Sequence, residues 1–162
     1  MDVLSHSEEQ TIPVEDLNLD ETVTRIEYSI RALIHHSNTT VKTDFAAFET
    51  INFNKAYLDS IFLNLITNSI KYANPNNAPI ITISTHIEGG KKQLIYTDNG
   101  IGFDMEKVAD KLFGLHQKFG NHSDSKGIGL YLVHSHVTSL GGKISVTSEL
   151  NKGTTFTITL KD

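Results

Sequence analysis

Helical and strand-like patterns occupy separate stretches of this 162-residue chain, and most of the strands come in pairs joined by short turns. Helices segregated from antiparallel hairpins favour the α+β class: a two-layer α/β sandwich with a mixed, mostly antiparallel sheet and three main helices on one face. Apolar spacing predicts the helices at about residues 20–36, with Asp20 as N-cap, at 55–73, capped by Asn54, and at 127–140. Strands are predicted at residues 11–14, 41–45, 50–53, 80–87, 93–97, 143–148 and 154–160.

The bulk composition indicates one soluble globular domain, which we expect in the cytoplasm. Hydrophobic residues make up 38% of the chain, and no apolar run approaches the ~20 residues that span a bilayer. A net charge of −5 without a basic stripe argues against nucleic acid as a partner, and we expect no direct membrane contact by this segment. The absence of cysteine excludes disulfides and thiolate metal sites. Residues 1–10 predict a disordered leader or a linker from upstream helices, and residues 11–162 predict the domain itself.

Polar side chains gather on one face of the helix predicted at residues 55–73. On a wheel advancing ~100° per residue, the opposite arc is apolar and suits packing on a sheet. Asparagine is roughly half a kcal/mol worse than alanine inside a helix, so two of them four residues apart point to a role for their side chains. A solvated polar face is the alternative interpretation. The polar face consists of Asn64, Asn68, Lys71 and Tyr72, and the apolar arc of Phe62, Leu65, Ile66, Ile70 and Ala73.

The sequence Asp98-Asn99-Gly100-Ile101-Gly102 follows directly on a predicted strand. A carboxylate at a strand end can accept a hydrogen bond from the exocyclic amine of a planar base, and glycines let the backbone approach the ring. Such a site prefers adenine to guanine, whose carbonyl would face the carboxylate. The alternative is a plain Asp-Asn-Gly turn, which is common in hairpins.

The sequence Lys126-Gly127-Ile128-Gly129-Leu130 opens the third predicted helix. Glycines at a helix N-terminus expose backbone amides at the positive end of the helix dipole, which suits a phosphate group; a flexible helix entry is the alternative. A long polar stretch at residues 100–126 precedes it, so it is not a Rossmann fingerprint, and a loop of that length is usually functional or disordered. No Walker P-loop and no eukaryotic-type protein kinase motif occurs in the chain.

Taken together and in this order, the motifs resemble the catalytic ATP-binding domain of bacterial sensor histidine kinases. That domain has the Bergerat or GHKL-type fold, in a superfamily shared with DNA gyrase, the large heat-shock chaperone ATPases and mismatch-repair ATPases. The likeness covers nearly everything from about Thr11 onward. Residues 63–72 resemble the N box, 98–102 the first glycine box, 111–113 the F box, 127–130 the second glycine box and 152–156 the closing hairpin.

The resemblance implies ATP and Mg²⁺ as cofactors and a nucleotide lid at about residues 103–126. Asn68 would supply an oxygen to Mg²⁺, and Lys118, in the lid, would reach the terminal phosphate. Asn64 and Lys71 would take part in catalysis as well as in ATP binding. The ATP-binding residues that it implies are Asn64, Asn68, Lys71 and Tyr72 on the helix, Asp98, Gly100, Gly102 and Thr154 at the adenine end, and Lys118, Gly127, Gly129 and Leu130 on the phosphate side.

The function implied is transfer of the γ-phosphate to a histidine on a separate phosphoacceptor domain of the same kinase, with a response regulator downstream. Asn64 stands where hydrolysing members of the superfamily carry a glutamate that activates water, so we expect little ATP hydrolysis. Two alternatives remain: a non-catalytic nucleotide-binding or regulatory module, and a serine kinase of the anti-sigma-factor type. None of the eight histidines is expected to be the phosphoacceptor, and we expect His134 and His136 at the surface.

Overall fold

The computed structural model describes residues 11–105 and 124–161, and gives residues 124–129 as backbone only. The predicted leader, most of the predicted lid with its F box, and Lys118 lie outside the described residues. Within the described ranges, no helix has the length and apolar content needed to cross a membrane.

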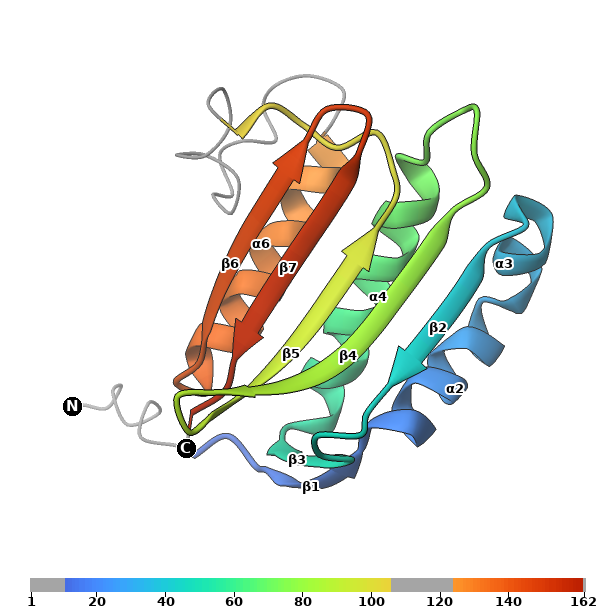
Figure 1. Cartoon of the computed structure of the whole chain (residues 1–162). Coiled ribbons are helices and arrows are strands. Elements are labelled where there is room, and N and C mark those ends of the chain that lie inside the picture. Colours follow the sequence, from blue (N-terminus) through green and yellow to red (C-terminus); the bar gives the residue numbers. More distant parts are fainter. Residues whose placement is uncertain (1–10, 106–123, 162) are drawn as a thin grey trace.

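The described chain forms a two-layer sandwich in which one five-stranded sheet is covered on one face by helices (Figure 1). The strand order is β2-β4-β5-β7-β6, and only the β2–β4 pair is parallel. A second sheet, of two strands, lies beside one end of the sandwich. The predicted fold class is therefore confirmed. The strands are β1 (Glu15–Asn18), β2 (Thr40–Asp44), β3 (Thr50–Phe53), β4 (Ile80–Glu88), β5 (Lys91–Asp98), β6 (Lys143–Glu149) and β7 (Gly153–Thr159); the helices are α2 (Leu19–Ser29), α3 (Arg31–Ser37), α4 (Lys55–Lys71) and α6 (Asp124–Ser139).

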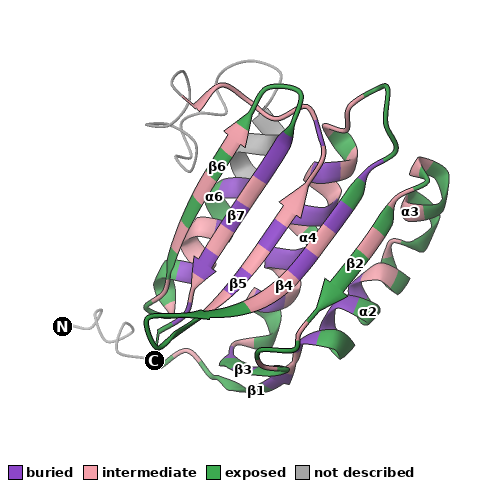
Figure 2. Ribbon diagram, viewed as in Figure 1, coloured by how far each residue is buried: buried purple, intermediate pink, exposed green. Residues whose placement is uncertain are grey.

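The core lies between the sheet and α4, which packs against both α2 and α6. Alternate residues of the central strands point to the helices, which gives the striped burial pattern along β4, β5 and β7 in Figure 2. The predicted apolar arc of α4 is largely the face that is buried: Phe62, Leu65 and Ile66 are at most 1% exposed. Helix α6 contributes the buried side chains Leu130, Val133 and Val137 at helical spacing.

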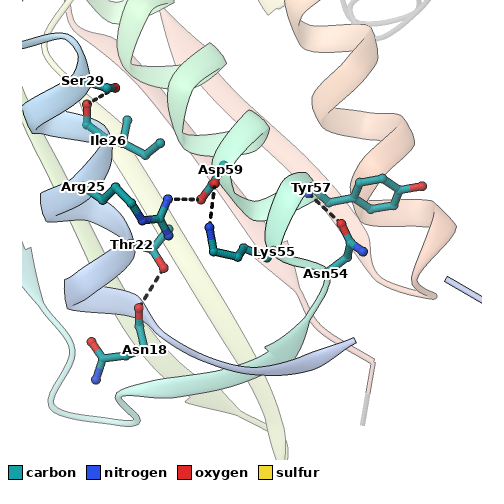
Figure 3. A network of polar contacts seen from close by, with 9 residues as sticks. All are labelled: Asn18, Thr22, Arg25, Ile26, Ser29, Asn54, Lys55, Tyr57 and Asp59. Carbon is teal, nitrogen blue, oxygen red and sulfur yellow. Dashed lines mark hydrogen bonds and ion pairs between the residues drawn. The ribbon is translucent and has the colours of Figure 1, made fainter. Parts of the chain in front are cut away.

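Polar contacts fix α4 at its N-terminal end (Figure 3). Asn54 caps the helix as predicted, because its side-chain oxygen accepts a hydrogen bond from the backbone N–H of Tyr57 at 3.0 Å. Arg25 of α2 reaches the carboxylate of Asp59 at 2.9 Å, and Lys55 lies 3.7 Å from the same group. The two ion pairs of Asp59 are at the surface and contribute at most about 1 kcal/mol each, so they align α2 with α4 more than they stabilise the fold.

The N-terminal prediction was wrong in two respects. The first strand is β1 rather than residues 11–14, because Leu17 is the residue that buries itself against β3, opposite Ile51. Asn18, not Asp20, is the N-cap of α2: its side chain accepts from the N–H of Glu21 at 2.8 Å. Asp20 lies exposed in the first turn, where its negative charge favours the helix dipole.

The single helix predicted at residues 20–36 is two helices that meet at Ile30. Ile30 has φ −120° and ψ 28°, and its N–H is shared between the carbonyls of Ile26 and Glu27. The hydroxyl of Ser29 donates to the Ile26 carbonyl at 2.7 Å and so competes with the helical backbone bond at that point. The helical spacing continues past the break, but α3 buries no side chain completely.

The remaining elements occur where the patterns predicted them, with shifted ends. Helix α6 begins at Asp124, three residues before the predicted start at Gly127, and α4 ends at Lys71 instead of Ala73. The turn after α6 uses Gly141, which has φ +85°, as the predicted C-terminal glycine. Strands β4 and β5 extend to the turn at Gly89 and Gly90, so they form one long antiparallel hairpin.

Candidate functional site

Most of the predicted ligand-binding residues meet where β5 ends beside the last turns of α4. These ends, the start of β7 and the first turns of α6 lie together at the upper end of the sandwich in Figure 1. A small pocket, partly open to solvent, lies between them. Its lining comprises Leu65, Asn68, Ser69 and Tyr72 from α4 and its C-cap, Asp98, Gly100, Gly102 and Phe103 from the end of β5, Leu130 from α6, and Thr154 and Phe156 from β7.

Asp98 is held at the floor of this pocket by three hydrogen-bond donors. Its Oδ1 accepts the backbone N–H groups of Gly100 at 3.0 Å and Thr154 at 3.2 Å. Its Oδ2 accepts the hydroxyl of Ser69, on α4, at 2.6 Å. The donors come from the turn after β5, from β7 and from α4, so the position of the carboxylate depends on how both layers pack. Such a group is preorganised to accept a further hydrogen bond from a ligand.

The hydrogen-bond chain behind Asp98 has a defined direction. A carboxylate only accepts, so the single hydroxyl hydrogen of Ser69 points to Asp98. Ser69 must then accept from its other neighbour, the Tyr96 hydroxyl, at 2.7 Å. Burial raises the pKa of Tyr96 well above its ordinary value, which keeps this phenol protonated and able to donate. The hydrogen bonds therefore run from Tyr96 to Ser69 and from Ser69 to Asp98, and they orient the carboxylate from within the core.

The glycines after Asp98 are required by close packing of the turn. A Cβ at Gly100 would lie 2.8 Å from the Tyr72 carbonyl oxygen. Gly102 has φ +65°, and a Cβ there would collide with the Glu149 carbonyl. A backbone hydrogen bond also joins this turn to the end of α4: the N–H of Ile101 donates to the Tyr72 carbonyl at 3.1 Å. The turn is thus clamped between the end of α4 and the β6–β7 hairpin.

Asn68 lines the pocket with an unpaired side-chain amide. Its Nδ2 is buried and has no hydrogen-bond partner among the described residues. An unsatisfied buried donor costs roughly 1–3 kcal/mol, so it indicates a polar group that the described residues do not supply. The amide oxygen is a hard ligand of the kind that Mg²⁺ accepts. No group of three or more His, Asp or Glu side chains gathers at metal-binding distance in the described part of the chain, so a metal here would take most of its ligands from a bound molecule and water.

Four other predicted residues lie around the pocket rather than in its lining. Asn64, one turn before Asn68, is half-buried and donates its Nδ2 to the Ser60 carbonyl at 2.8 Å. Lys71 is exposed, with its ammonium 5.5 Å from the Tyr72 ring centroid. Gly127 and Gly129 lie in the first turns of α6.

Sequence reasoning missed Ser69 and Tyr96, which hold Asp98. A signal for Ser69 exists: it lies about 140° from Asn64 on the helical wheel, between Leu65 and Ile66, so it is a polar residue in the apolar arc. A signal for Tyr96 is its place two residues before Asp98 on the same face of a central strand, where a buried hydroxyl needs a partner. The pocket-lining residues Leu65, Phe103 and Phe156 were also not assigned to the site.

The two histidines expected at the surface are only partly exposed. His134 and His136 are both half-buried, and His136 packs its ring against Tyr57 of α4. The cause is the tight packing of α6 on α4, which covers side chains beyond the apolar stripe. His35 and His36 are exposed at the end of α3, 6.0 Å apart by ring centroids.

Comparison with known proteins agrees with this geometry. The family model described as "Histidine kinase-, DNA gyrase B-, and HSP90-like ATPase" matches residues 54–162, which include both strands and both helices of the pocket. The chain belongs to this ATPase family. The resemblance stated from the motifs is therefore confirmed, and family membership implies ATP as the ligand.

Relatives of this ATPase domain are named as sensor proteins and kinases. The chain is 30% identical over 156 residues to the sensor protein RprX of Bacteroides fragilis, covering 93% of this chain and 30% of RprX. It is 32% identical over 147 residues to the heme sensor protein HssS of Staphylococcus saprophyticus, covering 91% of this chain and 31% of HssS. The chain thus spans about a third of the length of these curated relatives.

Solved structures share the fold. The Acinetobacter baumannii histidine kinase AdeS superposes with a TM-score of 0.75 at 21% identity, over 98% of this chain and 73% of that one. Full-length ShkA in complex with AMPPNP superposes with a TM-score of 0.75 at 20% identity, over 93% of this chain and 31% of that one. At these identities the likeness concerns the arrangement of the elements.

Proposed function

We propose that this chain binds ATP with Mg²⁺ and donates the γ-phosphate to a histidine on a separate phosphoacceptor domain of the same kinase, in a two-component system with a response regulator downstream. The observation that carries the proposal is Asp98, fixed by Ser69, Gly100 and Thr154 at the base of the pocket. The domain would comprise residues 11–162, with a lid at about 103–126, and would act in the cytoplasm.

At the adenine end, the Asp98 carboxylate would accept the exocyclic amine of the base. Its three protein donors leave lone pairs for a ligand, since a carboxylate has about four acceptor sites. Gly100 and Gly102 would let the ring lie close to the backbone, and Thr154 would border the base from β7. Adenine is favoured because guanine would present a carbonyl to Asp98.

At the phosphate end, the amide of Asn68 would bind Mg²⁺ through its oxygen, and the ion would neutralise charge on the phosphates. Lys71 and Tyr72 would contact phosphate oxygens from the last turn of α4, and Lys118 would do so from the lid. Gly127 and Gly129 would present backbone amides at the start of α6, next to Leu130. With these assignments, the nucleotide would extend from Asp98 at its adenine end, past the last turns of α4, to the start of α6 at its phosphate end.

Asn64 would favour transfer over hydrolysis. An amide cannot take a proton from water, so the position that carries a glutamate in hydrolysing relatives holds no base here. Phosphoryl transfer depends largely on positioning and charge stabilisation, so the γ-phosphate would remain until an imidazole nucleophile reaches it.

The test is a calorimetric titration of Mg-ATP into the chain and into Asp98→Asn, with Asp44→Asn, an exposed residue of β2, as matched control. Asp98→Asn should weaken binding about 100-fold or more, because it removes a charge-assisted bond worth roughly 3 kcal/mol and turns an amide donor toward the base. Asp44→Asn should bind as the unmodified chain does. Absence of binding by the unmodified chain would favour the non-catalytic module instead.

Transfer is tested by fusing the chain to a helical hairpin that carries a phosphoacceptor histidine. Incubation with γ-labelled ATP should give an acid-labile phosphoprotein, one ADP for each phosphate transferred, and little labelled inorganic phosphate. An acid-stable product on a serine would favour the anti-sigma type of kinase, and steady release of inorganic phosphate would contradict the role given to Asn64.

A further inference from the structure

His136 connects α6 to α4 through an aromatic contact. Its ring stacks on the ring of Tyr57 with a centroid distance of 4.4 Å and an interplanar angle of 22°. Tyr57 lies in the first turn of α4, where the Asn54 cap holds its backbone, and its ring is directed toward α6 in Figure 3. Two rigid helices therefore fix the imidazole plane.

The imidazole also ends a hydrogen-bond chain that begins at Asn64. The Nε2 of His136 lies 3.1 Å from the Oγ of Ser60. The Nδ2 of Asn64 donates to the same Oγ at 3.1 Å and to the Ser60 backbone carbonyl at 2.8 Å. The carbonyl accepts only, so it determines which end of the Asn64 amide faces Ser60: the nitrogen faces it, and the oxygen faces away.

The protonation state of His136 sets the direction of the hydrogen bond between Ser60 and His136. Burial lowers the pKa of His136, so the ring is neutral at pH 7 and its Nε2 can accept. In the His136 tautomer that carries its proton on Nδ1, Ser60 accepts from Asn64 with a lone pair and donates its one hydrogen to the Nε2 of His136. From α4 the titratable neighbour is Tyr57, and the partly buried side chains of β6 that pack inward are the uncharged Ile144 and Val146. Protonation of the ring would reverse the Ser60–His136 bond.

We propose that Ser60 and His136 are positioning residues for Asn64: they hold its amide with the nitrogen toward Ser60 and the oxygen available to a donor one turn before Asn68. His136 lies in the last turn of α6, so the same contact joins Asn64 to the C-terminal end of the helix that carries Gly127 and Gly129 in its first turns. The catalytic part of the inference rests on the proposed function, because it assumes that Asn64 takes part in transfer. The alternative is that the cluster only packs two helices together.

The first test needs no nucleotide. The side-chain amide signals of Asn64 are followed by NMR in the ¹⁵N-labelled chain between pH 5 and 8, alongside the imidazole signals of His136. The Asn64 signals should shift with the same midpoint as the His136 signals. The reason is that reversal of the Ser60–His136 bond changes the hydrogen bonding of the Ser60 hydroxyl, which accepts from Asn64.

Variants separate positioning from packing. His136→Phe keeps the ring stack on Tyr57 and removes the nitrogen, so it should abolish the pH-dependent shift of the Asn64 signals while the fold is retained. Ser60→Ala should abolish it too, and His35→Phe, on exposed α3, should leave it unchanged. Asn64 signals that do not move with pH in the unmodified chain, or that still move in His136→Phe, would overturn the proposal.

The second test uses the hairpin fusion. Ser60→Ala and His136→Phe should each lower the transfer rate about tenfold while changing the Kd for Mg-ATP less than twofold. Ser60→Ala in an Asn64→Ala background should cause no further loss, because both act through one amide. Unchanged or additive rates would overturn the catalytic part, whereas failure of the unmodified chain to bind ATP would refute the proposed function and leave the NMR result to decide on the positioning.

Discussion

Ser69 of α4 donates to Asp98 of β5 over 2.6 Å, and this bond joins the helical layer to the sheet at the base of the pocket. Ser69 is 4% exposed and lies in the face of α4 that otherwise packs apolar side chains. A polar residue at such a position is tolerated because both of its neighbours, Tyr96 and Asp98, are hydrogen-bonded to it. The bond therefore links core packing directly to the proposed adenine contact.

Ser69→Ala should weaken both the fold and nucleotide binding. The variant leaves the buried Tyr96 hydroxyl without its acceptor and Asp98 with one donor fewer, so the free energy of unfolding should fall by roughly 1–3 kcal/mol. The Kd for Mg-ATP should rise about tenfold, which corresponds to about 1.4 kcal/mol. Urea unfolding and calorimetry measure the two effects, with Ser84→Ala, half-buried on β4, as control. Unaltered affinity in a folded Ser69→Ala chain would show that Asp98 does not depend on this bond.

Tyr96→Phe should change how stability depends on alkaline pH. The pKa of Tyr96 is raised above its ordinary value of 10.0 by burial, so above pH 10 the unfolded chain loses a proton that the folded chain keeps. Stability must therefore fall as pH rises past that value, and part of this fall should disappear in Tyr96→Phe. Urea unfolding at pH 8 and at about pH 11 measures it. Tyr28→Phe, at a ring that is 66% exposed, is the control and should keep the full alkaline loss.

Local signals predicted the elements that carry the site. Asn54 caps α4, the apolar arc of α4 faces the sheet, and the strand before Asp98 ends where the Asp-Asn-Gly sequence begins. Each of these features depends on residues close together in the chain, where spacing and capping chemistry are visible. The pocket could then be placed because Asp98 and Asn68 lie at the ends of two elements that pack on each other.

Other features depend on contacts that spacing does not reveal. The break at Ile30 coincides with the bond from Ser29 back to the helix, although the apolar spacing continues through it. The contact of His136 with Ser60 joins residues 76 apart in the chain, so the half-burial of this histidine could not be read from its own helix. In both cases a side-chain hydrogen bond accompanies a local structure that hydrophobic patterning does not predict.

Gly102→Ala should destabilise the chain more than Gly89→Ala, although the two glycines have similar positive φ angles. Their φ values are +65° and +60°, so the intrinsic cost of a side chain is alike, at about 1–2 kcal/mol. A Cβ at Gly89 meets nothing within 4 Å, whereas one at Gly102 collides with the Glu149 carbonyl. We expect Gly102→Ala to lose at least about 2 kcal/mol more in urea unfolding. Equal losses would mean that the turn after β5 can move away from the β6–β7 hairpin.

Asn68→Ala should separate stability from metal-dependent binding. The variant removes a buried amide nitrogen that has no partner among the described residues, so the free energy of unfolding should be unchanged or rise by up to about 1 kcal/mol. Binding of ATP with Mg²⁺ should weaken at least tenfold, while binding of ATP in the presence of EDTA should change little, because the proposed contact of Asn68 is to the ion. Thermal unfolding and calorimetry with and without Mg²⁺ measure both effects. Asn76→Ala, exposed in the turn before β4, is the matched control. Equal weakening with and without Mg²⁺ would place Asn68 at the nucleotide rather than at the metal, and a large loss of stability would mean that its amide already has a structural partner.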